Sequence, residues 1–209
     1  MVEMHLLGVN VDYQYNAIYA LGVVTSYQRF MQGYRPEADK DAIFDAICQA
    51  MHYDPHRYRQ DAQRLLDAIQ HKSAADVVAW VEQSATSYGD DLQQQVKAIA
   101  DNPKFKYSRL LAIGLFTLLE TVDAEVVKQE AQREQLLGQL CTALRLPQDK
   151  VQKDLELYRS NLEKMAQAQA VMADMLEAER KKREDKQKNS AAAPPSVETS
   201  TVVTDLSES

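Results

Sequence analysis

Glycine and proline are scarce in this sequence of 209 residues, which contains six of each. These residues end helices and form most tight turns, so a chain that has few of them contains few turns and long elements. Cysteine is scarcer still. Cys48 and Cys141 are too far apart for a CxxC metal or redox motif, and two cysteines argue against a disulfide framework. We therefore expect two buried free thiols in a reducing compartment.

Long apolar runs are also absent. The nearest approach is the ten-residue run LLAIGLFTLL at 110–119, bounded by Arg109 and Glu120. A helix that spans a membrane needs about 20 apolar residues, so this run fits a buried core helix better. Residues 1–10 show neither the basic start nor the apolar stretch of a secretory signal. We expect no membrane span and no secretory signal.

Basic charge is not in excess, since 24 Lys and Arg stand against 31 Asp and Glu, for a net charge of -7. Proteins that grip nucleic acid through its phosphates normally present a basic face, so the balance argues against that role. One segment, 180–188 (RKKREDKQK), is locally basic. It fits either attraction to an anionic membrane surface or a solvated helix end whose cations suit the helix dipole. Its two acidic residues favour the solvated helix end.

What the sequence does contain is helical periodicity. Apolar spacing and turn residues predict a short helix at 1–7 and a loop at 9–16. They predict further helices at 17–31, 36–51, 55–70, 73–88, a polar helix ending near 101, and a helix at 108–121. Asp54-Pro55 and the pair Ser73 and Asp76 have the pattern of helix N-terminal caps.

The last third of the chain has a different composition. From Asp123 to Lys188 it is dominated by helix-forming residues, and Pro147 divides it. After Pro147 a seam of apolar residues recurs at spacings of four and three, as in a coiled coil. The seam consists of Val151, Leu155, Tyr158, Leu162, Met165, Met172 and Leu176. Whether it pairs within the chain or between chains is left open.

These patterns predict an all-α protein: a multi-helix bundle with a long, coiled-coil-like C-terminal helix and a disordered tail. We expect a bundle domain at 1–146, the long helix at 147–188 and the tail at 189–209. The tail holds Pro194-Pro195, no Lys or Arg, and many Ser, Thr and Ala residues, and it has too little apolar surface to order itself.

Catalytic and metal motifs are missing. There is no GxSxG, Walker loop, GxGxxG or HExxH pattern. His52 and His56 are four apart, but Pro55 interrupts the helix that would bring them together. We therefore expect no catalytic, cofactor-binding or metal site. An enzyme with a site assembled from scattered residues remains an alternative.

Two blocks of sequence, 2–48 and FKYSRLLAIGLFTLLE at 105–120, resemble the thylakoid formation protein family, photosystem II biogenesis factors of cyanobacteria and plastids. The segment PHRYRQDAQRLL at 55–66 is similar as well. The resemblance covers 2–175. Family members usually have a further N-terminal helical segment, which is expected to be missing here, and the tail matches nothing in the family.

The resemblance implies a non-enzymatic factor in thylakoid membrane biogenesis and photosystem II assembly or repair, without a cofactor. The resemblance implies that this factor acts through protein contact, with FtsH-type membrane proteases and photosystem II components as partners. It implies a peripheral place on the cytoplasmic side of the thylakoid membrane, in the cyanobacterial cytoplasm, or in the plastid stroma for a mature plastid form. The resemblance implies no nucleic-acid partner. It is compatible with a homo-oligomer.

Polar residues in the resembling blocks are the candidates for partner contact: Asp12, Arg29 and Arg109. Each of them could instead be structural, and Arg109 could cap the apolar helix that follows it. The alternative function is a generic coiled-coil adaptor or homodimeric scaffold without a dedicated photosynthetic role.

Overall fold

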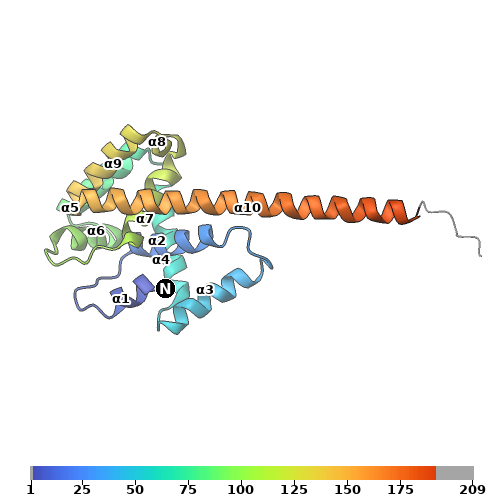
Figure 1. Ribbon diagram of the computed structural model, residues 1–209. Helices are drawn as coiled ribbons and strands as arrows, with labels where there is room; N and C mark the ends of the chain where they lie inside the picture. The colour runs from blue at the N-terminus through green and yellow to red at the C-terminus, as the bar shows by residue number, and fades with distance from the viewer. Residues whose placement is uncertain (1, 192–209) are drawn as a thin grey trace, which may run out of the picture. The chain divides into compact units, whose positions relative to one another are not determined.

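The computed structural model describes residues 2–191, and their side chains as far as 184 (Figure 1). The disordered tail is predicted to begin at 189, but residues 189–191 are still helical, and the rest of the predicted tail, from residue 192 onward, lies outside the described residues. Contacts divide the chain into a compact unit, Met1–Met165, and a second unit that begins at Ala166.

The all-α prediction is confirmed, since the described residues form ten helices and no strand. The helices are α1 (Val2–Gly8), α2 (Ala17–Phe30), α3 (Asp39–Ala50), α4 (Pro55–Ile69), α5 (Ala74–Thr86), α6 (Asp91–Asp101), α7 (Arg109–Val122), α8 (Ala124–Lys128), α9 (Glu130–Ala143) and α10 (Gln148–Ala191). A loop at 9–16 joins α1 to α2, as predicted.

Helices α2 and α7 form the centre of the compact unit. Both are apolar around most of their circumference, which is typical of helices buried on all sides. Gly22 of α2 and Gly114 of α7 lie where the two helices meet. A methyl group added at Gly22 would fall on the carbonyl oxygen of Leu110, and one added at Gly114 on that of Ile18. The two backbones are therefore in direct contact.

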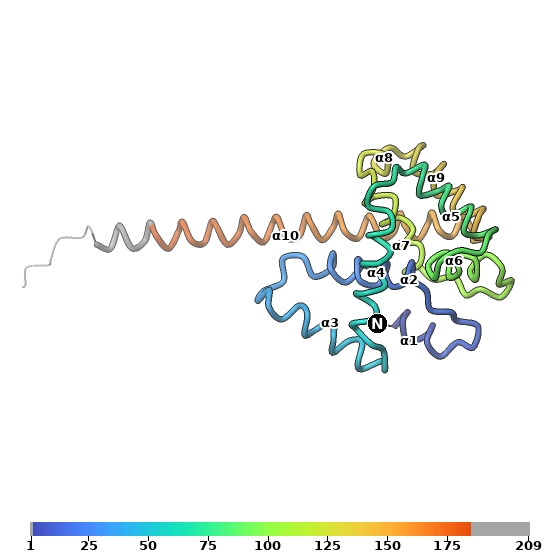
Figure 2. The backbone as a smooth tube through the Cα atoms, turned by 180° about the vertical axis from the view of Figure 1, so that it is seen from behind, coloured from blue at the N-terminus to red at the C-terminus, as the bar shows by residue number. Residues whose placement is uncertain are grey.

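The other helices pack around this pair. Helix α4 lies against α2, and α5 packs against both α6 and α9, as the views from front and back agree (Figures 1 and 2). The first part of α10, up to Met165, belongs to the compact unit. Its side chains Val151, Leu155 and Tyr158 are buried in the hydrophobic core.

Both predicted helix caps are confirmed. The Asp54 carboxylate accepts a hydrogen bond from the His56 backbone N–H at 2.9 Å, with Pro55 in the first turn of α4. Ser73 and Asp76 form a reciprocal capping box, with bonds of 3.1 Å and 3.0 Å. These residues satisfy N–H groups that a helix start otherwise leaves without partners.

Two helix boundaries differ from the sequence prediction. Helix α3 begins at Asp39, because the backbone from Pro36 forms tight turns in which the Asp39 N–H bonds back to the Pro36 carbonyl at 3.2 Å. The chain after Asp123 also divides at Gln129, which separates α8 from α9. Gln129 has an extended backbone, and composition alone gave no sign of this break.

Both cysteines are free and buried, as predicted. Burial raises the pKa of the Cys48 and Cys141 thiols to about 11. Because only the thiolate is a good nucleophile, we expect neither residue to react with a disulfide reagent at pH 8 within minutes, whereas both react in denaturant. A Val11→Cys variant is the control, since Val11 is exposed. Rapid labelling of the native wild-type protein would contradict this burial.

Candidate functional site

Arg29, one of the three predicted contact residues, joins three helices of the compact unit. It lies in the last turn of α2 and forms an ion pair with Glu120 of α7. Its guanidinium also lies over the ring of Tyr158 in α10, 6.0 Å from the centroid. Burial lowers the pKa of Arg29, but the contacts with Glu120 and Tyr158 together outweigh this effect and the net pKa is raised. Arg29 therefore has a structural role.

Arg109, the second predicted contact residue, is the first residue of α7. Its backbone N–H donates to a Glu3 carboxylate oxygen at 2.6 Å, and its side chain contacts Asp154 of α10 at 3.3 Å. The interpretation of Arg109 as the helix cap is wrong. Ser108 is the N-cap and accepts a hydrogen bond from the Leu111 N–H at 3.1 Å.

Asp154 is the polar centre of this junction between α7 and α10. It also accepts a hydrogen bond from the Tyr107 hydroxyl at 2.9 Å. Burial, followed by the hydrogen bond to Asp154, raises the pKa of Tyr107, so the phenol stays protonated and remains a donor. The structure thus brings Arg29 and Arg109 to the first part of α10. It places Asp12, the third candidate, in the exposed loop before α2.

The predicted seam has two different environments along α10. Val151, Leu155 and Tyr158 are core residues of the compact unit, and Leu162 packs against that core. Pairing within the chain therefore accounts for the start of the seam. Met172 and Leu176, in the second unit, are 65% and 68% exposed. The later part of the seam has an apolar surface without a covering element among the described residues.

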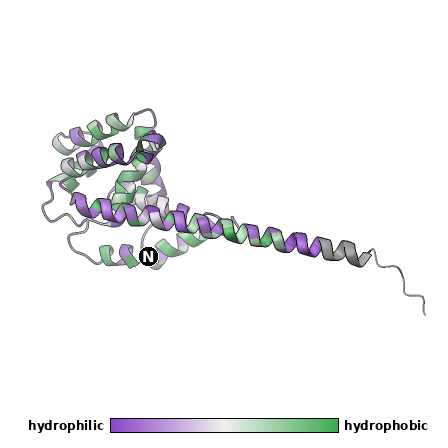
Figure 3. Cartoon of the chain, turned by 45° about the horizontal axis from the view of Figure 1, so that its top comes forward, coloured by the Kyte–Doolittle hydropathy of each residue, from purple (hydrophilic) through white to green (hydrophobic). Residues whose placement is uncertain are grey.

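Four exposed apolar residues of α10 lie close together, at 171–176. Val171 and Met175 accompany Met172 and Leu176, and all four are more than half exposed. Figure 3 shows apolar positions among the hydrophilic ones along this helix. Because α-helical positions three and four apart share a face, Met172, Met175 and Leu176 form one patch, which we call the α10 apolar face.

The basic segment that follows is paired within its own helix. Arg180 contacts Glu184 at 3.5 Å, Lys181 contacts Glu177 at 2.9 Å, and Arg183 contacts Glu179 at 3.9 Å. Such exposed pairs between successive turns are weak but partly neutralise the run. Within the described side chains this favours the solvated helix end over a membrane-binding segment.

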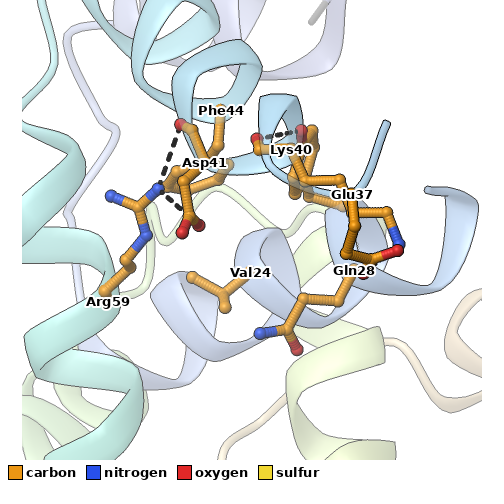
Figure 4. Close-up of a pocket in the computed structure, with 8 residues that line it drawn as sticks. Val24, Gln28, Glu37, Lys40, Asp41, Phe44 and Arg59 are labelled. Atoms are coloured by element: carbon orange, nitrogen blue, oxygen red, sulfur yellow. Dashed lines mark hydrogen bonds and ion pairs between the residues drawn. The ribbon is translucent and has the colours of Figure 1, made fainter. Parts of the chain in front are cut away.

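A polar pocket of about 340 Å³ lies between α2, α3 and α4, and no sequence pattern predicted it (Figure 4). Its charged groups already neutralise one another: Lys40 contacts Glu37 at 2.7 Å and Arg59 contacts Asp41 at 3.4 Å. The hydrogen bond from Lys40 holds the pKa of Glu37 below its usual range. A paired carboxylate that stays ionised is poorly suited to act as a general acid.

The described residues contain neither a metal-binding group nor a membrane span. These contain no group of three or more His, Cys, Asp or Glu side chains placed to hold a metal ion. His52 lies in the turn before α4, where its φ of 61° is left-handed, and His56 lies in the first turn of that helix. Across the described part of the chain, none of the helices combines the length and the apolarity needed to cross a bilayer.

The geometry defines an all-α bundle protein whose long C-terminal helix starts in the core and continues with an exposed apolar face. The chain belongs to the thylakoid formation protein family, whose model matches residues 1–187. The predicted resemblance is therefore confirmed.

Relatives and a solved structure agree with this assignment. The chain is 60% identical to Protein Thf1 of Trichormus variabilis over 198 residues, which cover 93% of this chain and 85% of the relative. It is 52% identical to Protein Thf1 of Acaryochloris marina, over 96% of this chain and 82% of that one. The solved structure of Psb29 superposes with a TM-score of 0.73 at 38% identity, covering 87% of this chain and 84% of that one. Membership of this family supports a role related to the thylakoid and photosystem II.

Proposed function

We propose that this protein is a non-enzymatic factor that supports thylakoid biogenesis and photosystem II assembly or repair by binding other proteins. The observation that carries this proposal is the α10 apolar face, where Met172, Met175 and Leu176 are each more than 60% exposed. Clustered apolar side chains on a charged helix are typical of a protein-binding surface. The paired carboxylates of the polar pocket favour contact over catalysis.

The partner class is part of this proposal and rests on the resemblance described above. FtsH-type membrane proteases and photosystem II components are the proposed partners, and the protein binds them from the cytoplasmic side of the thylakoid membrane. In this proposal the compact unit holds the start of α10 through Val151, Leu155 and Tyr158. The α10 apolar face then takes an apolar surface of the partner.

Co-purification from solubilised thylakoid membranes tests this proposal with a double variant, Met172→Glu and Leu176→Glu. We expect recovery of the protease to fall at least about tenfold, because burial of two such side chains contributes a few kcal/mol. Glutamate is a good helix former, so α10 should persist. The control is Ala170→Glu with Ala178→Glu, which adds the same charge at exposed positions away from the α10 apolar face.

Three outcomes would count against the proposal. The wild-type protein could migrate free of any protease. A strain without the protein could retain unchanged protease abundance. The control could lose the partner as completely as the double variant does.

The exposed end of the seam also favours the adaptor or homodimer as a second candidate. Apolar residues at coiled-coil spacing could pair with a second copy of the chain. Sedimentation of the full chain distinguishes the two: a dimer that Met172→Glu with Leu176→Glu converts to a monomer favours self-pairing. If the wild type and the double variant are both monomers, the α10 apolar face is available to bind a different protein.

A further inference from the structure

The methionines of this chain differ widely in their exposure to solvent. Of the six whose burial the structure describes, four are buried or half-buried: Met4, Met31, Met51 and Met165. The other two, Met172 and Met175, are 65% and 63% exposed. They lie three positions apart on the α10 apolar face, so their thioethers share one side of the helix. The most accessible methionines of the described chain therefore lie on the surface proposed to bind a partner.

Helix formation does not explain why methionine stands at these two positions. Leucine and methionine form helices about equally well, and both side chains are apolar. Leu176, on the same face, contains no sulfur. Methionine adds two properties that leucine lacks: an unbranched side chain that adapts to different partner surfaces, and a thioether that oxidants attack. The polarity of this face therefore depends on the oxidation state of two sulfur atoms.

The two cysteine thiols compete poorly for an oxidant. Cys48 and Cys141 are buried, and burial raises the pKa of each thiol to about 11, so little thiolate is present at neutral pH. Oxidation of a thiol requires the thiolate, whereas a thioether has no proton to lose and reacts wherever it is accessible. A peroxide in solution should therefore react first with Met172 and Met175.

We propose that Met172 and Met175 form a reversible oxidation site that switches off protein binding by the α10 apolar face. This inference rests on the proposed function of that face. The oxidant is hydrogen peroxide. A sulfur lone pair attacks one peroxide oxygen, the O–O bond breaks, and the other oxygen leaves with both hydrogens as water. Sulfur is oxidised to the sulfoxide and the peroxide is reduced.

The sulfoxide makes the face polar at two of its three positions. Its oxygen is a hydrogen-bond acceptor, and burying it against an apolar partner surface would cost free energy. Methionine sulfoxide reductases reverse the step with a dithiol: the two thiols become a disulfide, and the sulfoxide oxygen leaves as water. The α10 apolar face would thus regain its apolar character once the oxidant is removed.

Peptide mass spectrometry of the full chain tests where oxidation occurs. After brief treatment with dilute hydrogen peroxide, we expect Met172 and Met175 to gain an oxygen atom at least about tenfold faster than the buried Met4, with Cys48 and Cys141 unmodified. In denaturant the methionine rates should converge. Equal rates for Met172, Met175 and Met4 in the native protein would overturn the proposed site.

Co-purification with the FtsH-type protease from solubilised thylakoid membranes tests the switch. The protein is oxidised first, and the peroxide is removed before the membranes are added. We expect recovery of the protease to fall at least about tenfold after oxidation, and to return after treatment with both stereospecific sulfoxide reductases and a dithiol. The fall should persist in a Met31→Leu, Met51→Leu variant and vanish in a Met172→Leu, Met175→Leu variant. Treated and untreated samples are compared within each variant, so any effect of the substitutions themselves cancels.

The outcomes separate the switch from the proposed function. If oxidised and reduced wild type recover the protease equally, while Met172→Glu with Leu176→Glu loses it, the switch is wrong and the proposed function stands. If that glutamate variant also recovers the protease fully, both are wrong. Equal sensitivity to peroxide in the Met172→Leu, Met175→Leu variant would place the effect elsewhere in the chain and overturn the switch.

Discussion

Replacing Gly114 with alanine is expected to lower the free energy of unfolding by at least about 3 kcal/mol, at the top of the range for an overpacked core. The added methyl group would meet the Ile18 carbonyl, which belongs to the backbone of α2. Backbone atoms cannot change rotamer, so α2 and α7 would have to move apart. That movement would loosen the core along the whole length of this helix pair.

The matched control is Gly138→Ala in α9. There the methyl group would approach the Gln148 side-chain nitrogen at 3.0 Å, and that side chain can turn away. Since alanine also favours a helix by up to about 1 kcal/mol over glycine, this variant should be neutral or stabilised. Urea unfolding measured by circular dichroism compares the two. Equal midpoints for Gly114→Ala and the wild type would contradict backbone contact between α2 and α7.

Ending the chain at Leu146 is expected to cost about 5 kcal/mol, most of the stability of a typical domain. This truncation removes Val151, Leu155 and Tyr158 from the core and leaves an apolar groove in the compact unit. It also removes Asp154, the partner of both Tyr107 and Arg109. We expect a loosely packed chain that binds apolar dyes.

Ending the chain at Met165 is the matched comparison, because this position is the limit of the compact unit. That shorter chain should unfold at nearly the same urea concentration as the full protein. The domain boundary predicted at 146 remains a prediction, and this pair of truncations tests it. A cooperative, fully stable 1–146 fragment would show that α10 is an appendage from its first residue.

Local features of the fold were predictable from the sequence. The Asp54 and Ser73 caps depend on residues two or three positions away, so their pattern can be read directly. The burial of 110–119 followed from its apolar run. The start of α3 was not predictable in this way, because Pro36 is as compatible with a turn as with a first helical turn.

Contacts between distant parts of the chain could not be read from one sequence. Arg29 and Glu120 are 91 positions apart, and no local pattern connects them. The same holds for Gly22 and Gly114, whose importance appears only once α2 and α7 cross. The seam residues share one spacing from Val151 to Leu176, and this spacing does not show which of them are buried. Only the packing of the compact unit shows that the first ones pack within the chain.

Site-specific photo-crosslinking in isolated thylakoid membranes tests most directly whether the α10 apolar face contacts a partner. A photoreactive residue is introduced at Met172, on this face, and separately at Asp174, which lies half a helical turn away. Both positions are exposed. We expect a product with an FtsH-type protease or a photosystem II component from position 172 and little or none from position 174. Equal products from both positions, or none from position 172, would contradict the proposed contact.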